Sequence, residues 1–286
     1  MMKKITLTLA IIFCCGLTTT GFAQVMEDDS ESDQWVSFYD DVHRGKYKPF
    51  EFLPVRRADV VKETRVWRVI DFREKQNQIF YYPLEPTQGR VSLYYALDRA
   101  AREGIIRVYS DDDCKKEVEW NERKSKIIPP KTQTLLKWNE DIGEEEPYDT
   151  VMTTTIQPED IKKLRIKENW FVDKQRSVRD VRIFSFALIY DQPEGRGEIA
   201  LFWVHYDDPE VRQLLANTEV FNPHNDALRL SYDDLFIKRR FASYIMQESN
   251  VFARRIGEYL TGEDMLLESN RIENELFNYD EDMWEY

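Results

Sequence analysis

The sequence predicts an α+β protein with a mixed, largely antiparallel sheet, flanking helices and a helical, acidic C-terminal segment. Two apolar runs, 178–190 and 198–206, have the composition of buried strands, and a glycine-containing connection between them is typical of an antiparallel hairpin. Helix-start residues follow at Asp208 and Ser231. We therefore expect the sheet mainly in the second half of the chain and the helices towards the C-terminus.

Residues 1–23 have the pattern of a secretory signal peptide. Two lysines precede the apolar run 5–17, and small residues follow at Gly21 and Ala23. The run is shorter than the roughly 20 residues that a membrane span requires. Neither cysteine of this run follows the small residue that a lipoprotein site requires. We expect cleavage between Ala23 and Gln24 and no direct lipid anchor.

Charge and cysteine content exclude several classes of function. Cleavage would remove two lysines and change the formal charge from −13 to −15, which disfavours a nucleic-acid-binding role. We expect the short basic run 238–240 on the solvated face of a helix. Only Cys114 would remain, so no internal disulfide can form, and the preceding aspartates 111–113 disfavour its thiolate. These aspartates lack the spacing of a calcium loop and predict a solvated loop.

The first half predicts an acidic lead and a β-β-α-β region. Residues 24–34 are polar and acidic, which is typical of a flexible lead. The arm 46–54 contains two prolines between aromatic residues, so it is extended and packs on its own core or on a neighbouring subunit. Region 35–142 then contains four expected elements, namely strand 65–72, strand 79–82, a helix between Ser92 and Gly104, and strand 105–109.

The acidic, glycine-containing loop 143–147 is the expected boundary to a second region, 143–262. A short helix at 159–164 and a strand at 167–173 precede the predicted hairpin. Two helices complete the region. One begins after Asp208, and the other covers 235–247 and continues towards Leu260.

The last segment, 263–286, is an acidic amphipathic tail. Arg271 is its single basic residue, yet it keeps more apolar side chains than a disordered tail would. Such a segment docks on a partner or on helices of its own chain.

The sequence contains no motif of a known catalytic or cofactor-binding class. It lacks a G-x-S-x-G elbow, an H-E-x-x-H pair, a phosphate-binding glycine loop and a C-x-x-C pair. His205 lies in an expected strand and His224 among turn-forming residues, so neither predicts a base or a metal ligand. We predict a non-enzymatic protein without cofactor or metal. A metal-dependent hydrolase remains a weaker alternative.

Aromatic and arginine residues instead suggest a binding surface. Aromatic rings suit sugar faces as well as protein interfaces, so a periplasmic glycan-binding module remains an alternative. Alternation of tryptophan with arginine favours protein contact. The partner-binding candidates are Trp67, Arg68, Trp170, Arg176, Arg179, Leu276, Phe277 and Trp284.

Seven runs resemble a known family over roughly residues 35–286. They are RVWRVIDFREK at 65–75, FYYP at 80–83, DKQRS at 173–177, VRI at 181–183, VFNPHNDALRLSYDDL at 220–235, RFASYI at 240–245 and ESNV at 248–251. In this order they resemble the GldN/PorN family of the gliding-motility and type IX secretion apparatus of Bacteroidetes.

The resemblance implies a periplasmic structural subunit that associates with the outer membrane only through a partner. The expected partners are an outer-membrane lipoprotein of the GldK/PorK type, further copies of the chain within a ring, and the periplasmic domain of the motor protein GldM/PorM. The resemblance supplies no catalytic residues.

Overall fold

The computed structural model describes residues 48–282 except 88, 130, 140–143, 153–155, 193–196, 221, 223–229 and 253. The expected signal peptide at 1–23, the acidic lead at 24–34, His224 and Trp284 lie outside the described residues.

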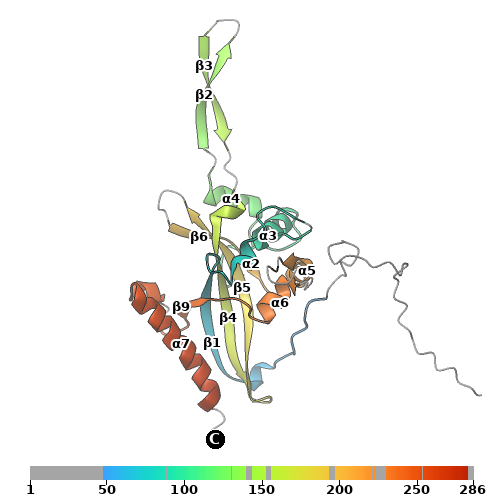
Figure 1. Cartoon of the computed structure of the whole chain (residues 1–286), viewed down its shortest axis with the longest axis vertical. Helices are drawn as coiled ribbons and strands as arrows, with labels where there is room; N and C mark the ends of the chain where they lie inside the picture. Colours follow the sequence, from blue (N-terminus) through green and yellow to red (C-terminus); the bar gives the residue numbers. More distant parts are fainter. Residues whose placement is uncertain are drawn as a thin grey trace, which may run out of the picture. The chain divides into compact units, whose positions relative to one another are not determined.

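A five-stranded antiparallel sheet, with strand order β6-β5-β4-β1-β9, is the largest sheet of the described chain (Figure 1). Its strands are β1 (Val60–Asp71), β4 (Ile161–Asp173), β5 (Val178–Gln192), β6 (Gly197–His205) and β9 (Tyr244–Glu248). The α+β class and the predicted antiparallel pairing of β5 with β6 are confirmed. Because β1 pairs with β4, this sheet joins strands from both sides of the boundary expected near residue 143.

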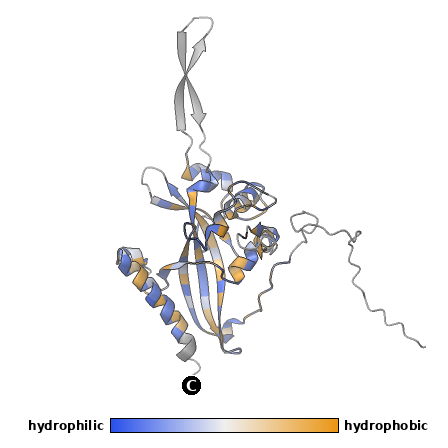
Figure 2. Ribbon diagram, in the orientation of Figure 1, coloured by the Kyte–Doolittle hydropathy of each residue, from blue (hydrophilic) through white to orange (hydrophobic). Residues whose placement is uncertain are grey.

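One face of this sheet is buried under two apolar clusters. The register places Arg68 opposite Ile166 and Ile70 opposite Leu164, so these side chains share a face. The larger cluster adds side chains from α2 (Gln78–Tyr81), α3 (Leu93–Arg102), α4 (Trp120–Ile127), α5 (Pro209–Asn217) and α6 (Tyr232–Ile237). The smaller cluster joins sheet residues to α7 (Glu263–Asp282), along which Figure 2 shows hydrophobic and hydrophilic residues side by side.

Asp208 precedes α5 as predicted but makes no side-chain capping hydrogen bond, whereas both ends of α3 are capped as the sequence predicts. Ser92 accepts a hydrogen bond from the Tyr95 amide at 3.3 Å, as an N-cap residue does. At the other end of α3, Gly104 has a φ of +68°, and the Ile105 amide donates to the Ala100 carbonyl at 2.9 Å. This pattern is the Schellman motif that the position of Gly104 predicts.

The described part of the arm, from residue 48, packs on the chain's own core, as predicted. Arg212 donates to the Phe50 carbonyl, and the Phe50 amide donates to Asp233 at 3.3 Å. The Phe52 ring lies 6.5 Å from the ring of Tyr206. These contacts account for Phe52 and for the backbone of Phe50 within the chain, whereas the Phe50 ring stays 59% exposed.

The strand predicted at 79–82 is wrong, because Gln78–Tyr81 forms the short helix α2. The buried Asn77 donates to the Asp71 carbonyl at 2.9 Å and to the Ala242 carbonyl at 2.8 Å, which turns the chain after β1. Phe80 then enters an aromatic cluster, with its ring 5.5 Å from that of Phe236. Tertiary packing overrides the strand composition of this segment.

The prediction of a helix at 235–247 is wrong beyond Ile237, where α6 ends. Its start is confirmed, since Ser231 accepts from the Asp234 amide at 3.1 Å. However, α6 ends at Ile237, and Arg239 adopts a φ of +49° that a helix cannot continue through. Residues 244–248 then extend the sheet as β9 beside β1. The basic run 238–240 therefore does not lie on a helix face.

Two further predicted elements are shorter than expected. Residues 105–109 contribute only isolated bridges, from Tyr109 to Trp203 and to Glu117. The helix expected at 159–164 is a single 3-10 turn, η3 (Pro158–Asp160), because β4 begins at Ile161.

The remaining elements are small. Strands β2 (Lys131–Asn139) and β3 (Glu144–Met152) form a separate hairpin, and the expected boundary falls in its connection, outside the described residues. The other short elements are β7 (Glu219–Val220), β8 (Leu230–Ser231), η2 (Arg57–Asp59) and η5 (Ile256–Glu258).

Candidate interaction surfaces

A buried ionic cluster on the sheet anchors the elements around it. The fully buried carboxylate of Glu168 accepts hydrogen bonds from Arg239 Nη1 at 2.7 Å and from Trp170 Nε1 at 3.0 Å. Arg68, 2% exposed, places Nε 3.2 Å from Glu168 Oε2, close enough for an ion pair but not aligned as a hydrogen bond. Two arginines therefore share one carboxylate, and a buried charge of this kind requires such partners.

Helix α7 is attached to this cluster and to the sheet. Arg68 Nη1 donates to Glu273 at 3.0 Å, and the Ile245 amide of β9 donates to Ser269 Oγ at 2.7 Å. Ile272 and Leu276 are buried in the smaller apolar cluster. The tail therefore docks on its own chain, against the sheet and the short helix η5 (Ile256–Glu258).

Three large apolar side chains of α7 remain exposed outside this packed face or at its edge. Leu266, Leu267 and Phe277 are 53%, 58% and 49% exposed, and we call them the outer stripe. The Phe277 ring stands perpendicular to Trp170 at 6.1 Å, with the Arg179 guanidinium 4.9 Å from its centroid. Exposed apolar side chains that cluster on one element are typical of a contact surface.

The acidic loop 111–113 is not a freely solvated loop. Asp112 accepts from Trp67 Nε1 at 2.8 Å and from the buried Lys167 ammonium at 3.2 Å. Lys115 and Lys167 hold the pKa of Asp113 at about 2. Burial raises the pKa of the Cys114 thiol to about 12, so the thiol stays protonated at neutral pH. A lysine buried in β4 therefore holds this loop on the sheet.

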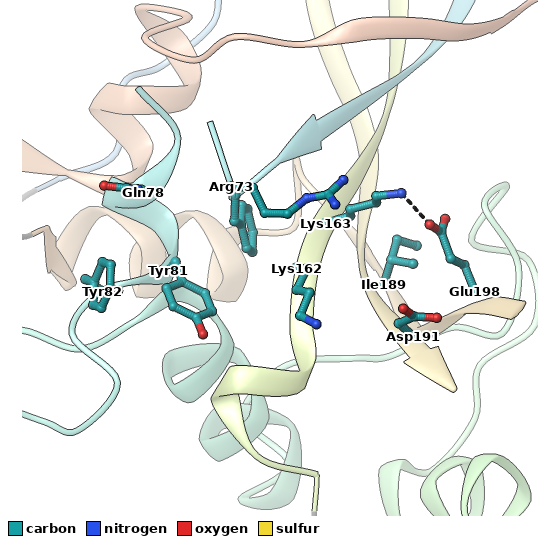
Figure 3. A pocket seen from close by; sticks show the side chains of 10 residues that line it. Arg73, Gln78, Tyr81, Tyr82, Lys162, Lys163, Ile189, Asp191 and Glu198 are labelled. Atoms are coloured by element: carbon teal, nitrogen blue, oxygen red, sulfur yellow. Dashed lines mark hydrogen bonds and ion pairs between the residues drawn. The ribbon is translucent and has the colours of Figure 1, made fainter. Parts of the chain in front are cut away.

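A cleft of about 440 Å³ lies where α2 meets the ends of β4, β5 and β6 (Figure 3). Its lining consists of Phe72, Arg73, Gln78, Tyr81, Tyr82, Lys162, Lys163, Ile189, Asp191 and Glu198. Lys163 is paired with Glu198, and Arg73 with Asp71 just outside the cleft. The rings of Tyr81 and Tyr82 lie 5.0 Å apart and nearly perpendicular. The cleft thus combines aromatic surface with charges of both signs.

Within the described ranges, no group of three or more His, Cys, Asp or Glu side chains is arranged to hold a metal ion. The same part of the chain has no helix with the length and apolar content that a membrane crossing requires.

Comparison with known families decides the class of the protein. The family described as gliding motility associated protein GldN matches residues 55–285, which is most of the chain. The chain belongs to the GldN family. This family is a structural component of the gliding-motility and type IX secretion machinery, so the chain is a component of that machinery. A comparison with proteins of curated function finds no match.

Three of the predicted partner-binding residues are used inside this GldN-family fold. Arg68, Trp170 and Leu276 are buried, and in this structure they link the sheet to α7. Arg179 lies between them, since it donates to the Leu276 carbonyl.

The other candidates differ in exposure. Trp67 is half-buried against Asp112, and Arg176 is exposed but paired with Asp173 at 2.7 Å. Phe277 is the most exposed described aromatic among them. Glu168, Lys167 and Glu273 were not predicted from the sequence, although a charged pair inside the strand-like run 167–173 was a visible signal of buried ion pairing.

Proposed function

We propose that the chain is a periplasmic, non-enzymatic structural subunit of the type IX secretion and gliding-motility machinery. In this proposal it forms a ring with an outer-membrane lipoprotein of the GldK/PorK type and further copies of itself. The ring couples to the periplasmic domain of a GldM/PorM-type motor protein, and membrane association occurs only through partners. Membership of the GldN family carries the proposal, and the signal-peptide pattern of residues 1–23 supports export.

The outer stripe of α7 is the proposed contact with the lipoprotein. Its three apolar side chains lie on a helix whose inner side is already held by Ile272, Glu273 and Leu276. Because α7 is acidic with one arginine, the complementary surface would be apolar with a basic rim. Burial of exposed Leu and Phe side chains contributes roughly 1.5–3 kcal/mol each before ordering costs.

Co-purification from envelope fractions tests the proposal. The tagged chain should recover an outer-membrane lipoprotein at a constant ratio, and the double variant Leu266→Glu, Leu267→Glu should lose it while its melting temperature stays unchanged. The matched control is Glu263→Gln at the start of the same helix, which should retain the lipoprotein. Recovery of the chain without any envelope partner would contradict the proposed ring, and full recovery with the double variant would contradict the assigned surface.

A further inference from the structure

The cleft between α2 and the ends of β4, β5 and β6 has the size of a small-molecule site. It shares no residue with the outer stripe. Its volume of about 440 Å³ falls within the roughly 300–1,000 Å³ of small-molecule sites. Figure 3 shows Tyr81 and Tyr82 on the α2 side, and Lys162, Asp191 and Glu198 on the sheet side. No partner surface assigned so far uses these residues.

A β-bulge in β4 aims two lysines into this cleft. Ile161 lies opposite Tyr190 and Lys163 lies opposite Ile189, so Lys162 is an extra residue in the ladder. In a regular strand, consecutive side chains point to opposite faces. Here Lys162 and Lys163 both line the cleft. Bulges recur beside functional sites because they re-aim a side chain in this way.

Two carboxylates face these lysines from the neighbouring hairpin. Asp191 lies directly opposite Glu198 in the β5–β6 register, so the two side chains share a face. Like charges placed directly opposite each other destabilise a sheet. Lys163 compensates Glu198 by an ion pair, whereas the ammonium of Lys162 and the carboxylate of Asp191 have no polar partner among the described residues. Within the part of the chain that the structure describes, one donor and one acceptor of opposite charge thus remain available for a ligand.

The opposite wall offers aromatic surface. Tyr82 is 44% exposed, and its ring stands nearly perpendicular to that of Tyr81. Burial raises the pKa of Tyr81, so its hydroxyl stays neutral and can donate. Because Arg73 is compensated by Asp71 and Lys163 by Glu198, no strong excess of either charge remains to attract an ion.

We propose that this cleft binds a neutral saccharide. The apolar face of a sugar ring stacks on Tyr82, its hydroxyls donate to Asp191, and they accept from Lys162. An anionic ligand would meet the carboxylates of Asp191 and Glu198, and a purely apolar ligand would leave both charges desolvated and unpaired. This binding activity is separate from the proposed subunit assembly.

Calorimetric titration of the full chain with four neutral tetrasaccharides, namely fully N-acetylated chitotetraose, cellotetraose, maltotetraose and mannotetraose, tests the proposal. We expect saturable one-to-one binding of at least one of them. For that ligand, Tyr82→Ala should weaken affinity about tenfold, equivalent to about 1.4 kcal/mol. Lys162→Gln and Asp191→Asn should each weaken it several-fold.

Two control variants each change an exposed lysine or an exposed aromatic ring away from the cleft. Lys174→Gln changes an exposed lysine that directly follows β4 at its other end, and Phe252→Ala removes an exposed ring after β9. Both should bind as the unsubstituted chain does.

Three outcomes would overturn the proposal. They are the absence of saturable binding with all four sugars, unchanged affinity in Tyr82→Ala, and tighter binding of acidic tetragalacturonate than of every neutral sugar. Lipoprotein co-purification is measured on the same variants. Since none of them alters the outer stripe, a failure of sugar binding with intact co-purification leaves the proposed function standing.

Discussion

Replacing Glu168 with glutamine will destabilise the fold strongly, because two arginines share its carboxylate. The substitution keeps the size of the side chain and an acceptor for Trp170 Nε1, and it removes only the charge. Loss of one partner from a buried ion pair costs roughly 3–5 kcal/mol. After the substitution, Arg68, which is 2% exposed, still forms an ion pair with Glu273. The side chain of Arg239 is 32% exposed, so water solvates part of its charge. We therefore expect a loss near the lower end, about 3 kcal/mol.

Urea unfolding followed by circular dichroism measures this loss as a lower midpoint with an unchanged slope. For a domain of this size, about 3 kcal/mol corresponds to a decrease in melting temperature of roughly 6–12 °C. The matched control is Glu63→Gln on β1, since Glu63 forms only a 4.0 Å surface contact with Arg65. That contact is worth at most about 1 kcal/mol. If Glu168→Gln loses no more than the control, the carboxylate does not hold the arginines as the structure indicates.

Three further predictions concern single residues. Asp113, with a pKa held at about 2 against an ordinary 3.8, stabilises the fold above its ordinary pKa, and this contribution is lost as pH falls towards 2. Asp113→Asn should therefore lose less stability than the original chain as pH falls from 3.8 to about 2, measured by urea titrations at a series of pH values. Asn77→Ala removes two hydrogen bonds to backbone carbonyls and should cost about 3 kcal/mol in the same unfolding assay. Cys114→Ser should leave secretion intact at normal protein level, because the thiol is protonated; a secretion defect would contradict this.

The sequence predicts those elements whose signals are local. Ser92, Gly104 and Ser231 act through the backbone within four residues of themselves, so their capping roles could be identified without tertiary information. The strands β5 and β6 were equally visible because their apolar runs exceed what a solvated strand carries. In each case the signal that predicts the element lies within one short segment of the sequence.

The failures occur where distant contacts decide the conformation. Residues 244–248 have apolar spacing that also suits a helix, and they become a strand because β1 offers an unpaired edge there. Residues 78–81 become a helix because Asn77 bonds to Ala242, which lies 165 positions away in the chain. Local composition carries no information on either contact.

The same distinction between local signals and distant contacts applies to the predicted binding residues. Aromatic and arginine content predicted a binding surface, but it could not separate side chains that contact a partner from those that hold the chain together. Arg68 and Trp170 belong to the second group because the β1–β4 register places them around Glu168. The cleft was not predicted, since the aiming of Lys162 depends on a bulge that has no sequence signature.

Helix α7 shows why the docked tail remains compatible with a role in assembly. Its inner side is fixed by Arg68, Ile245 and the buried Ile272, so α7 needs no partner to remain ordered. A helix that is already ordered loses little conformational entropy when its outer stripe binds, which makes each buried apolar side chain more effective for affinity. This docked position favours the proposed role of the outer stripe, because Leu266 and Leu267 can be substituted without altering the buried contacts of Ile272 and Leu276 that hold α7 on the sheet.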